Sequence, residues 1–226
     1  MKILVVDDEK LLVKGIKFNL QNEGYQVECA YDGAAAVELA RTGNFDLIIL
    51  DLMMPEIDGL EACMRIREFS NVPIIMLTAR SQEFDELMGF EAGADDYVTK
   101  PCSPSVLMKR VAALLRRDTS ANDSKVVSVD DLKLDNFAHE VWLGGSSVML
   151  TVKEYSILQK LLSSPGRVFT REQLLDDIWG YDFTGDIRTV DSHVARLRTK
   201  LGEWGSKHIK TIYGTGYKLE VKENEG

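Results

Sequence analysis

Long hydrophobic runs, paired cysteines and internal repeats are absent from this sequence of 226 residues. No apolar run approaches the ~18–20 residues that cross a bilayer, and the apolar stretch in the opening MKILVVDDEK is too short for a secretory signal. The three cysteines, Cys29, Cys63 and Cys102, are widely spaced and form no CxxC, which argues against a disulfide framework or a zinc site. We therefore expect a cytoplasmic protein that makes no contact with a membrane.

An excess of positive charge is also absent, because the formal net charge is −9. An acidic chain at first argues against a nucleic-acid partner, but the charge is uneven. Residues 1–120 hold 13 bases and 20 acids, whereas residues 121–226 hold 14 and 16. Within the second part, residues 188–218 hold seven bases and two acids, a local net charge of +5. Such a stretch is either a solvated helix face or an electrostatic footprint for phosphate groups.

The polar segment DTSANDSK, residues 118–125, is interpreted as a linker because it contains no large apolar side chain. Before it, short apolar runs alternate five times with segments of helical periodicity. The pairs are ILVVD with 11–20, YQVECA with 34–40, LIILD with 60–66, PIIMLT with 84–90, and DYVTK with 106–115. This alternation predicts, for residues 1–117, a doubly wound α/β domain with five parallel strands and helices on both faces.

The part after the linker, residues 126–223, has a different pattern. Short strand candidates come first, VVSV, LKLD, EVWL and VML, separated by turn residues. The segments 151–154 and 170–173 both have the spacing of a capping box at a helix start. A third helix is expected over residues 188–201, and IKTIYGTGYKLEV predicts a β-hairpin around residues 214–216. The second domain is therefore expected to be α+β.

Polar side chains stand at the carboxyl ends of the predicted parallel strands, where doubly wound sheets bind ligands. They are Asp7, Asp8, Asp51, Thr78 and Lys100. Three neighbouring carboxylates repel one another, and Mg²⁺ both prefers oxygen ligands and commonly accompanies phosphoryl groups. A carboxylate beside a metal, an amine and a hydroxyl is equipped for phosphoryl transfer, with Asp51 as the nucleophile. Each residue alone also has a structural interpretation, since aspartates cap helices and begin turns.

The segments ILVVDDE, LIILDLMMPEIDG, PIIMLTAR and GADDYVTKP resemble the receiver domain of bacterial two-component response regulators. The resemblance covers residues 1–117. It implies that Asp51 accepts a phosphoryl group and that Asp8 binds Mg²⁺ directly, with Asp7 acting through water. It also implies that the backbone carbonyl of Met53 completes the protein's part of the metal shell.

The same resemblance assigns roles to residues around the acceptor. Thr78 and Lys100 would contact the phosphoryl group, and Lys100–Pro101 would be a cis peptide bond, which an X-Pro bond adopts at modest cost. Thr78 and Tyr97 would form a switch, in which the hydroxyl moves to the phosphoryl group and the aromatic ring turns inward. Without the resemblance, Tyr97 is better interpreted as a half-packed strand residue.

The third helix of the second domain has an apolar face and a face of small residues. The apolar stripe consists of Val190, Val194, Leu197 and Leu201. The opposite face carries Arg188, Ser192, Ala195 and Thr199. The stripe would face the domain core, and the small residues would let the other face enter the major groove of DNA.

The segments LTVKEYSILQKLLSSPGRVFTREQLLDDIWG, RTVDSHVARLRTKLG and IKTIYGTGYKL resemble the winged-helix effector domain of the OmpR/PhoB family, over about residues 125–222. The resemblance implies a four-stranded N-terminal sheet, three helices and a wing that bind double-stranded DNA. It makes Arg196 the best candidate for a base contact and Arg198 for a phosphate contact. The candidate DNA-binding residues are Arg188, Thr189, Ser192, His193, Arg196, Arg198, Thr215 and Tyr217.

Two further segments of the second domain keep alternative interpretations. Trp179 ends the second helix, where it either packs near the DNA backbone or belongs to the core. Residues 180–187 match a loop that contacts RNA polymerase in some members of the family.

The expected receiver dimer departs from the family pattern. Glu86 and Val106 occupy the places of a basic residue on the fourth helix and a Glu on the fifth, so the usual salt bridge between subunits is absent. Tyr213 and Ala195 also replace arginines found in some members, so a DNA sequence preference cannot be taken from any relative. We expect the homodimer to pair through the fourth and fifth helices, with a surface that includes Asp95, Asp96, Arg110 and Arg117.

Together these features predict a transcription factor controlled by phosphorylation. A sensor histidine kinase would phosphorylate Asp51, and the chain would be a phosphoryl acceptor rather than an enzyme, apart from slow self-dephosphorylation. One alternative is a metal-dependent phosphohydrolase, for which no added general acid or base is apparent near the site. The other is a phosphorylation-independent DNA-binding regulator whose receiver serves mainly as a dimerisation module.

Overall fold

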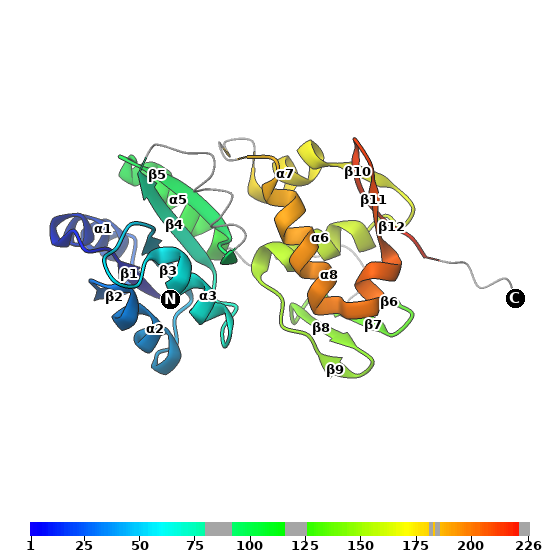
Figure 1. The fold of residues 1–226 in the computed structure, drawn as a ribbon, viewed down its shortest axis with the longest axis horizontal. Coiled ribbons are helices and arrows are strands. Elements are labelled where there is room, and N and C mark those ends of the chain that lie inside the picture. Colours follow the sequence, from blue (N-terminus) through cyan, green and yellow to red (C-terminus); the bar gives the residue numbers. More distant parts are fainter. Residues whose placement is uncertain (80–91, 116–125, 181–182, 184–185, 222–226) are drawn as a thin grey trace, which may run out of the picture. The chain divides into compact units, whose positions relative to one another are not determined.

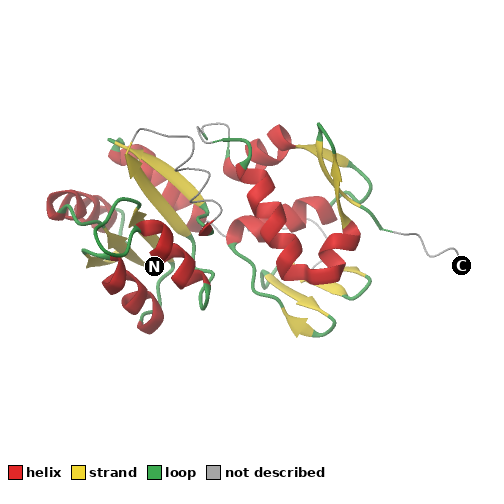
Figure 2. Cartoon of the chain, in the orientation of Figure 1, coloured by secondary structure: helices red, strands yellow, loops and turns green. Residues whose placement is uncertain are grey.

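The computed structural model describes residues 1–79, 92–115, 126–180, 183 and 186–221. The chain divides into two compact units, Met1–Arg117 and Asp118–Gly226, whose helices and strands Figures 1 and 2 show. Each unit has its own hydrophobic core. Among the described residues, no helix is both long and apolar enough to cross a membrane.

A parallel sheet forms the centre of the first unit, with strand order β2-β1-β3-β4-β5. The strands are β1 (Lys2–Val6), β2 (Gln26–Ala30), β3 (Leu47–Asp51), β4 (Ile74–Ala79) and β5 (Asp96–Lys100). The helices described are α1 (Lys10–Asn22), α2 (Gly33–Thr42), α3 (Gly59–Arg67) and α5 (Pro104–Leu115). Helices α1 and α5 cover one face of the sheet, and α2 and α3 cover the other (Figure 1). The doubly wound fold is confirmed, while the helix expected over residues 84–90 lies outside the described residues.

The strand order explains why the polar strand ends meet. Strand β1 pairs with β2 on one side and β3 on the other, so the direction of winding reverses between β1 and β3. The carboxyl ends of strands at such a reversal border a crevice in which ligands bind. Strand β3 is buried at every position, which accounts for its unbroken apolar run.

The second unit begins with an antiparallel sheet in the order β6-β7-β8-β9. Its strands are β6 (Val126–Val129), β7 (Leu132–Asp135), β8 (Glu140–Leu143) and β9 (Ser146–Ser147). Three of the four predicted strands are confirmed, but the prediction of a strand at VML is wrong. Gly144 and Gly145 both have positive φ and form a two-residue turn, so pairing resumes at once with Ser146 opposite Leu143.

Three helices and a second sheet complete this unit. The helices are α6 (Val152–Leu162), α7 (Arg171–Trp179) and α8 (Thr189–His208). Both predicted capping boxes are present, at Thr151 and Thr170. The second sheet has the order β10-β12-β11, from β10 (Val168–Thr170), β11 (Ile209–Ile212) and β12 (Gly216–Leu219). The hairpin of β11 and β12 is the wing predicted around residues 214–216, and the α+β winged-helix architecture is confirmed.

Helix α8 differs from its prediction at its carboxyl end. Gly202 has φ 55° and ψ −133°, which interrupts the helix where the sequence predicts its end. Helical structure then resumes to His208. The indole of Trp204 in this extension donates a hydrogen bond to the Val129 carbonyl at 3.0 Å, which fixes the extension to the antiparallel sheet.

Candidate functional site

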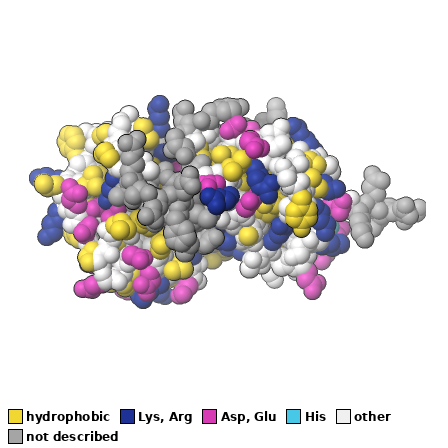
Figure 3. All heavy atoms as spheres, turned by 45° about the horizontal axis from the view of Figure 1, so that its top comes forward, with side chains coloured by type: hydrophobic (Ala, Val, Ile, Leu, Met, Phe, Trp, Pro, Cys, Tyr) yellow, Lys and Arg dark blue, Asp and Glu magenta, His cyan; other side chains and the backbone are white. Residues whose placement is uncertain are grey.

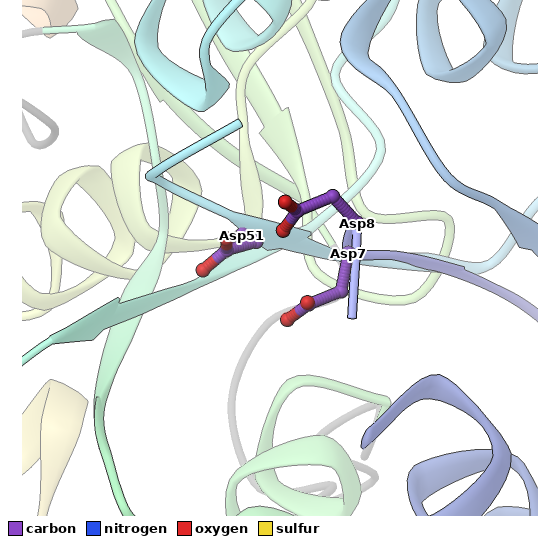
Figure 4. Close-up of side chains that lie close together, drawn as sticks. All are labelled: Asp7, Asp8 and Asp51. Atoms are coloured by element: carbon purple, nitrogen blue, oxygen red, sulfur yellow. The ribbon is translucent and has the colours of Figure 1, made fainter. Parts of the chain in front are cut away.

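Three carboxylates gather at the carboxyl ends of β1 and β3 (Figure 4). Asp7 and Asp8 directly follow β1, and Asp51 is the last residue of β3. One carboxylate oxygen of each lies within 4.8 Å of the others. Asp7 and Asp51 are buried, whereas Asp8 is exposed. The cluster therefore has a buried floor and an opening to solvent at Asp8.

Lys100, the last residue of β5, reaches into this cluster. Its Nζ lies 2.6 Å from Asp7 Oδ2 and 2.5 Å from Asp51 Oδ1. Burial raises the pKa of the Asp51 carboxyl, and Asp7 and Asp8 raise it further, while Lys100 opposes the rise. Burial alone lowers the pKa of Lys100, but its hydrogen bonds to Asp51 and Asp7 raise it overall. Lys100 thus pairs with two of the three carboxylates, and among the described residues the cluster keeps an excess of negative charge.

The chemistry of these donors fits a hard divalent cation. Mg²⁺ binds through one or two carboxylates, keeps several waters, and accompanies phosphoryl groups. Asp7, Asp8 and Asp51 carry more negative charge than the one positive charge of Lys100 can neutralise. Because Asp8 is exposed, water can also reach a cation bound there. Met53, whose backbone carbonyl is the remaining predicted ligand, lies two residues after Asp51, and its side chain is 67% exposed to solvent.

The loop between β3 and α3 returns closely to the acceptor strand, a feature that the sequence interpretation missed. Gly59 donates its backbone N–H to the Leu52 carbonyl at 2.9 Å. A Cβ at Gly59 would lie 2.2 Å from the carbonyl oxygen of Asp51. Only glycine fits without displacing that backbone, and the Asp58-Gly59 dipeptide was the available signal.

The predicted switch residues are both buried in strands. Thr78 lies near the end of β4 and is 2% exposed, and Tyr97 in β5 is 6% exposed. The Tyr97 hydroxyl donates to Met76 Sδ at 3.2 Å, so the ring lies inward in this structure. The Lys100–Pro101 peptide bond is cis, as predicted.

Most residues predicted for the dimer surface already have hydrogen-bond or ion-pair partners within the same domain. Asp95 is fully buried and accepts hydrogen bonds from Arg67 Nη2 at 2.8 Å and the Ile74 N–H at 3.0 Å. Asp96 is 2% exposed and lies 3.5 Å from Arg110 Nη1. The prediction that Asp95 reaches a second subunit is therefore corrected, because its carboxylate fixes the end of α3 to β4. Arg117 and Glu86 lie outside the described residues.

Helix α8 has the two faces that its sequence predicts. The apolar stripe of Val190, Val194, Leu197 and Leu201 is fully buried. Exposed side chains on the helix include Arg188, Ala195 and Thr199, with Ser192 partly exposed. On the face of the chain that Figure 3 shows, Lys and Arg side chains are spread among other types rather than gathered in one large patch.

Two predicted DNA contacts are inside the domain instead. Thr189 and His193 are both 0% exposed, and His193 Nδ1 lies 2.9 Å from the Thr189 carbonyl oxygen. The His193 ring packs edge-on against Trp179, with centroids 5.0 Å apart. Buried side chains cannot reach base edges, so the prediction that Thr189 and His193 contact DNA is wrong. Both residues belong to the domain core. Trp179, 6% exposed, also takes the core alternative.

The two arginines expected to contact DNA have intramolecular partners. Arg196 Nε lies 3.4 Å from Oε1 of the buried Glu154, whose Oε2 accepts from Lys200 Nζ at 2.8 Å. Arg198 donates from Nε and Nη2 to the Ile209 carbonyl at 3.0 and 2.6 Å. Glu154 was recognised in the sequence only as a capping residue, since its partners lie 42 and 46 positions away.

The wing presents one predicted contact and buries the other. Thr215 at its tip is exposed, and the neighbouring Tyr213 is 92% exposed. Tyr217 is 4% exposed and donates its hydroxyl to Asp191 Oδ1 at 2.5 Å. The Tyr217 ring is therefore part of the domain interior rather than its surface.

Comparison with known proteins accounts for both units. Residues 3–112 match the response regulator receiver domain, and residues 145–219 match the C-terminal domain of transcriptional regulatory proteins. Transcriptional regulatory protein SrrA of Staphylococcus aureus is 45% identical over 234 aligned residues, which cover 99% of this chain and 97% of SrrA.

Solved structures agree with this assignment. A point mutant of RitR superposes with a TM-score of 0.75 at 29% identity, covering 98% of this chain and 99% of that one. DrrB of Thermotoga maritima, an OmpR/PhoB homologue, has a TM-score of 0.51 at 36% identity, covering 97% and 98%. With both family matches in the same order and full-length relatives, this chain belongs to the OmpR/PhoB-type response regulators, transcriptional regulators that join a receiver domain to a DNA-binding domain.

Proposed function

We propose that a sensor histidine kinase phosphorylates this chain on Asp51 and that the modification controls DNA binding. The observation that carries the proposal is the acidic cluster of Asp7, Asp8 and Asp51, in which the Lys100 ammonium pairs with Asp7 and Asp51. A buried cluster with excess negative charge is costly unless cations and phosphoryl oxygens bind there. Its position at the winding reversal gives a phosphoryl donor access to the cluster.

Phosphoryl transfer would proceed by direct attack. An Oδ atom of Asp51 attacks phosphorus, the new P–O bond replaces the P–N bond of a phosphohistidine, and the departing imidazole takes up a proton. Lys100 exchanges its bond with Asp51 for a phosphoryl oxygen, and Thr78 donates its hydroxyl to another. Asp7, Asp8, Asp51 and the Met53 carbonyl would hold Mg²⁺, which supplies charge neutralisation of the phosphoryl oxygens.

The modified receiver would favour one of two conformations, with Thr78 and Tyr97 as the switch residues. We propose that this conformation forms a homodimer through the surface of the fourth and fifth helices. Pairing would bring two DNA-binding domains to adjacent half-sites and raise their effective concentration. We further propose that the protein acts in the cytoplasm, does not turn over substrate as an enzyme, and dephosphorylates itself only slowly.

The proposed DNA surface consists of the exposed face of α8 and the wing tip. The proposed contacts are Arg188, Ser192, Arg196, Arg198 and Thr215. Arg196 would have to exchange or share its partner Glu154 to reach DNA, whereas Arg198 would contact DNA while keeping its bonds to the wing. Once bound, the domain would contact RNA polymerase through residues 180–187.

A DNA selection experiment tests this function. Wild type and Asp51→Asn are each incubated with Mg²⁺, with or without a small phosphoryl donor such as acetyl phosphate, at fixed salt. We expect the donor to tighten wild-type binding to the selected site and to shift the protein to a dimer. Asp51→Asn should bind equally with and without the donor.

Equal binding by both proteins, independent of the donor, would support the alternative in which the receiver mainly dimerises. Thr78→Ala provides a second variant, because it leaves the acceptor in place and removes only the switch hydroxyl. We expect it to accept the phosphoryl group but to show a smaller gain in DNA affinity.

A further inference from the structure

One carboxylate oxygen joins three elements of the DNA-binding domain. Asp191 lies in the first turn of α8, and its Oδ1 accepts from Arg171 Nε at 2.7 Å and from the Tyr217 hydroxyl at 2.5 Å. Arg171 begins α7, and Tyr217 lies in the wing strand β12. The recognition helix, the helix before it and the wing therefore meet at a single atom.

A second connection lies two turns further along α8. The guanidinium of Arg198 donates to the Ile209 carbonyl and, at 2.9 Å, to Thr211 Oγ1 in β11. Thr211 is the cross-strand partner of Tyr217. Asp191 and Arg198 thus hold facing residues of the two wing strands, which fixes both the position and the tilt of the hairpin on α8.

The surroundings keep the Tyr217 hydroxyl a hydrogen-bond donor. Arg171 and Arg198 lie over its ring, 5.2 and 5.6 Å from the centroid. Burial and the hydrogen bond to Asp191 raise the pKa of Tyr217 to about 12, so the hydroxyl stays protonated near neutral pH. At Gly216, a Cβ would lie 2.1 Å from the Phe169 carbonyl oxygen, which shows how closely β12 packs on β10.

We propose that Asp191 is a positioning residue for DNA recognition, which locks the wing to the recognition helix so that both engage DNA as one rigid unit. This inference rests on the proposed DNA-binding function. An acid on this helix would otherwise weaken binding, because its side chain is 39% exposed and repels phosphates. The positioning role offsets that repulsion by reducing the conformational freedom lost on binding.

The two interpretations of Asp191 predict opposite signs. If it were only a surface charge, Asp191→Asn would tighten binding to all DNA. If it positions the wing, Asp191→Asn and the uncharged change Tyr217→Phe should both weaken binding to the selected site by roughly ten-fold. Tyr217→Phe should leave binding to random duplex DNA unchanged, because it alters no charge.

The experiment uses the full chain and two readouts. Binding to the site selected with wild type is compared with binding to random duplex of the same length. Hydrogen exchange of residues 209–219 is measured on the free protein. We expect faster exchange in this hairpin for both variants, and a double variant no weaker than either single one. Glu203→Gln, exposed on the same helix beyond Gly202, is the matched control and should change neither the exchange nor the site preference.

Several results would overturn the inference: tighter binding by Asp191→Asn, unchanged hairpin exchange, or equal losses on selected and random DNA. If the wild type selects no DNA, the proposed function fails. Hairpin exchange then decides whether Asp191 locks the wing, and the role in DNA recognition is rejected.

Discussion

Both domains contain a buried carboxylate at the heart of a polar cluster, but the balance of charge differs. In the receiver, Asp7, Asp8 and Asp51 lie together and Lys100 pairs with Asp7 and Asp51, so among the described residues three acids meet one base. In the DNA-binding domain, Glu154 meets two positive charges, Arg196 and Lys200. Glu154 also accepts the Thr151 N–H at 2.9 Å, which closes a capping box.

This difference in charge distinguishes a ligand-binding site from a cluster of ion pairs that only holds elements of the fold together. A buried acid whose partners satisfy it holds elements together, and its removal leaves unpaired charges. An acidic cluster with too few cations is under repulsion, which ligand binding relieves. Burial alone does not distinguish the two, since Asp51 and Glu154 are 2% and 0% exposed. The net charge of each cluster distinguishes them.

The largest expected effect is the loss of phosphoryl acceptance in Asp51→Asn. The variant should show no mass increase with acetyl phosphate and Mg²⁺, because the amide is not a nucleophile. Its stability should be equal to or greater than that of wild type, because one repelling carboxylate is removed and Lys100 keeps Asp7. Intact-mass analysis and denaturant unfolding measure the two properties.

Asp58→Asn is the control for Asp51→Asn. Asp58 caps α3 by accepting the Glu61 N–H at 2.8 Å, and Asn caps about as well as Asp. This variant should be phosphorylated normally. A large loss of stability in Asp51→Asn would contradict this distinction, since it would mean that Asp51 mainly holds the fold together.

Glu154→Gln, unlike Asp51→Asn, should lower stability, and we expect it to destabilise the DNA-binding domain by about 2–3 kcal/mol. Glutamine keeps a capping acceptor, as Gln173 does at the equivalent position of α7, so the change isolates the loss of charge beside Arg196 and Lys200. All three tryptophans, Trp142, Trp179 and Trp204, lie in the second unit. Tryptophan fluorescence during urea unfolding therefore reports this domain alone.

Glu172→Gln is the matched control for Glu154→Gln, because Glu172 is an exposed acid in the first turn of α7. Its unfolding midpoint should stay close to that of wild type. If Glu154→Gln shifted the midpoint no more than this control, the buried ion pairs would not be structural.

Mg²⁺ should stabilise the receiver and not the DNA-binding domain. At ten times its dissociation constant, the expected gain is about 1.4 kcal/mol. Hydrogen exchange of the β1 and β3 amides measures the receiver, and tryptophan fluorescence measures the other domain. Asp8→Asn should abolish the gain, while an equal gain in both domains would indicate a general salt effect.

The regular elements were predictable because their signals are local. Hydrophobic periodicity placed strands β1 to β8 and helices α1, α2, α3 and α5 to within two residues, and capping residues placed the starts of α6 and α7. Strand β10 was not predicted, β9 lies before its predicted position, and α8 extends seven residues past its predicted end at residue 201. The strand order then brought Asp7, Asp51 and Lys100 together, as expected for parallel strands. Predicting this acidic cluster needed only the positions of the strand ends.

The partners of polar side chains were predicted less well, for two reasons. His193 lies three residues after Val190 and one before Val194, so its place on the apolar face was available from spacing, but its polar type suggested the surface. Asp191 and Tyr217 are 26 residues apart, and no local pattern predicts that pair. Long-range pairs depend on how the elements pack.

The smallest expected effect concerns Arg188 and Asp186. Asp186 accepts the Arg188 N–H at 2.7 Å and two guanidinium bonds at 2.8 and 2.5 Å. These hydrogen bonds lower the pKa of Asp186, chiefly through the Arg188 side chain. Asp186→Asn should therefore cost less than about 1 kcal/mol at pH 7, because the Arg188 side chain is 52% exposed and screened by solvent.

The sign of the pH dependence tests this assignment. A carboxyl with a lowered folded pKa contributes stability above its unfolded value, about 3.9, and loses that contribution as the pH falls through the folded pKa. The difference between wild type and Asp186→Asn, followed by tryptophan fluorescence, should be present at pH 7 and shrink below about pH 4. The same variant releases Arg188 from its acid, so DNA binding should tighten slightly if Arg188 contacts phosphate. Weaker binding would instead mean that Asp186 orients Arg188 toward DNA, as Asp191 is proposed to orient the wing.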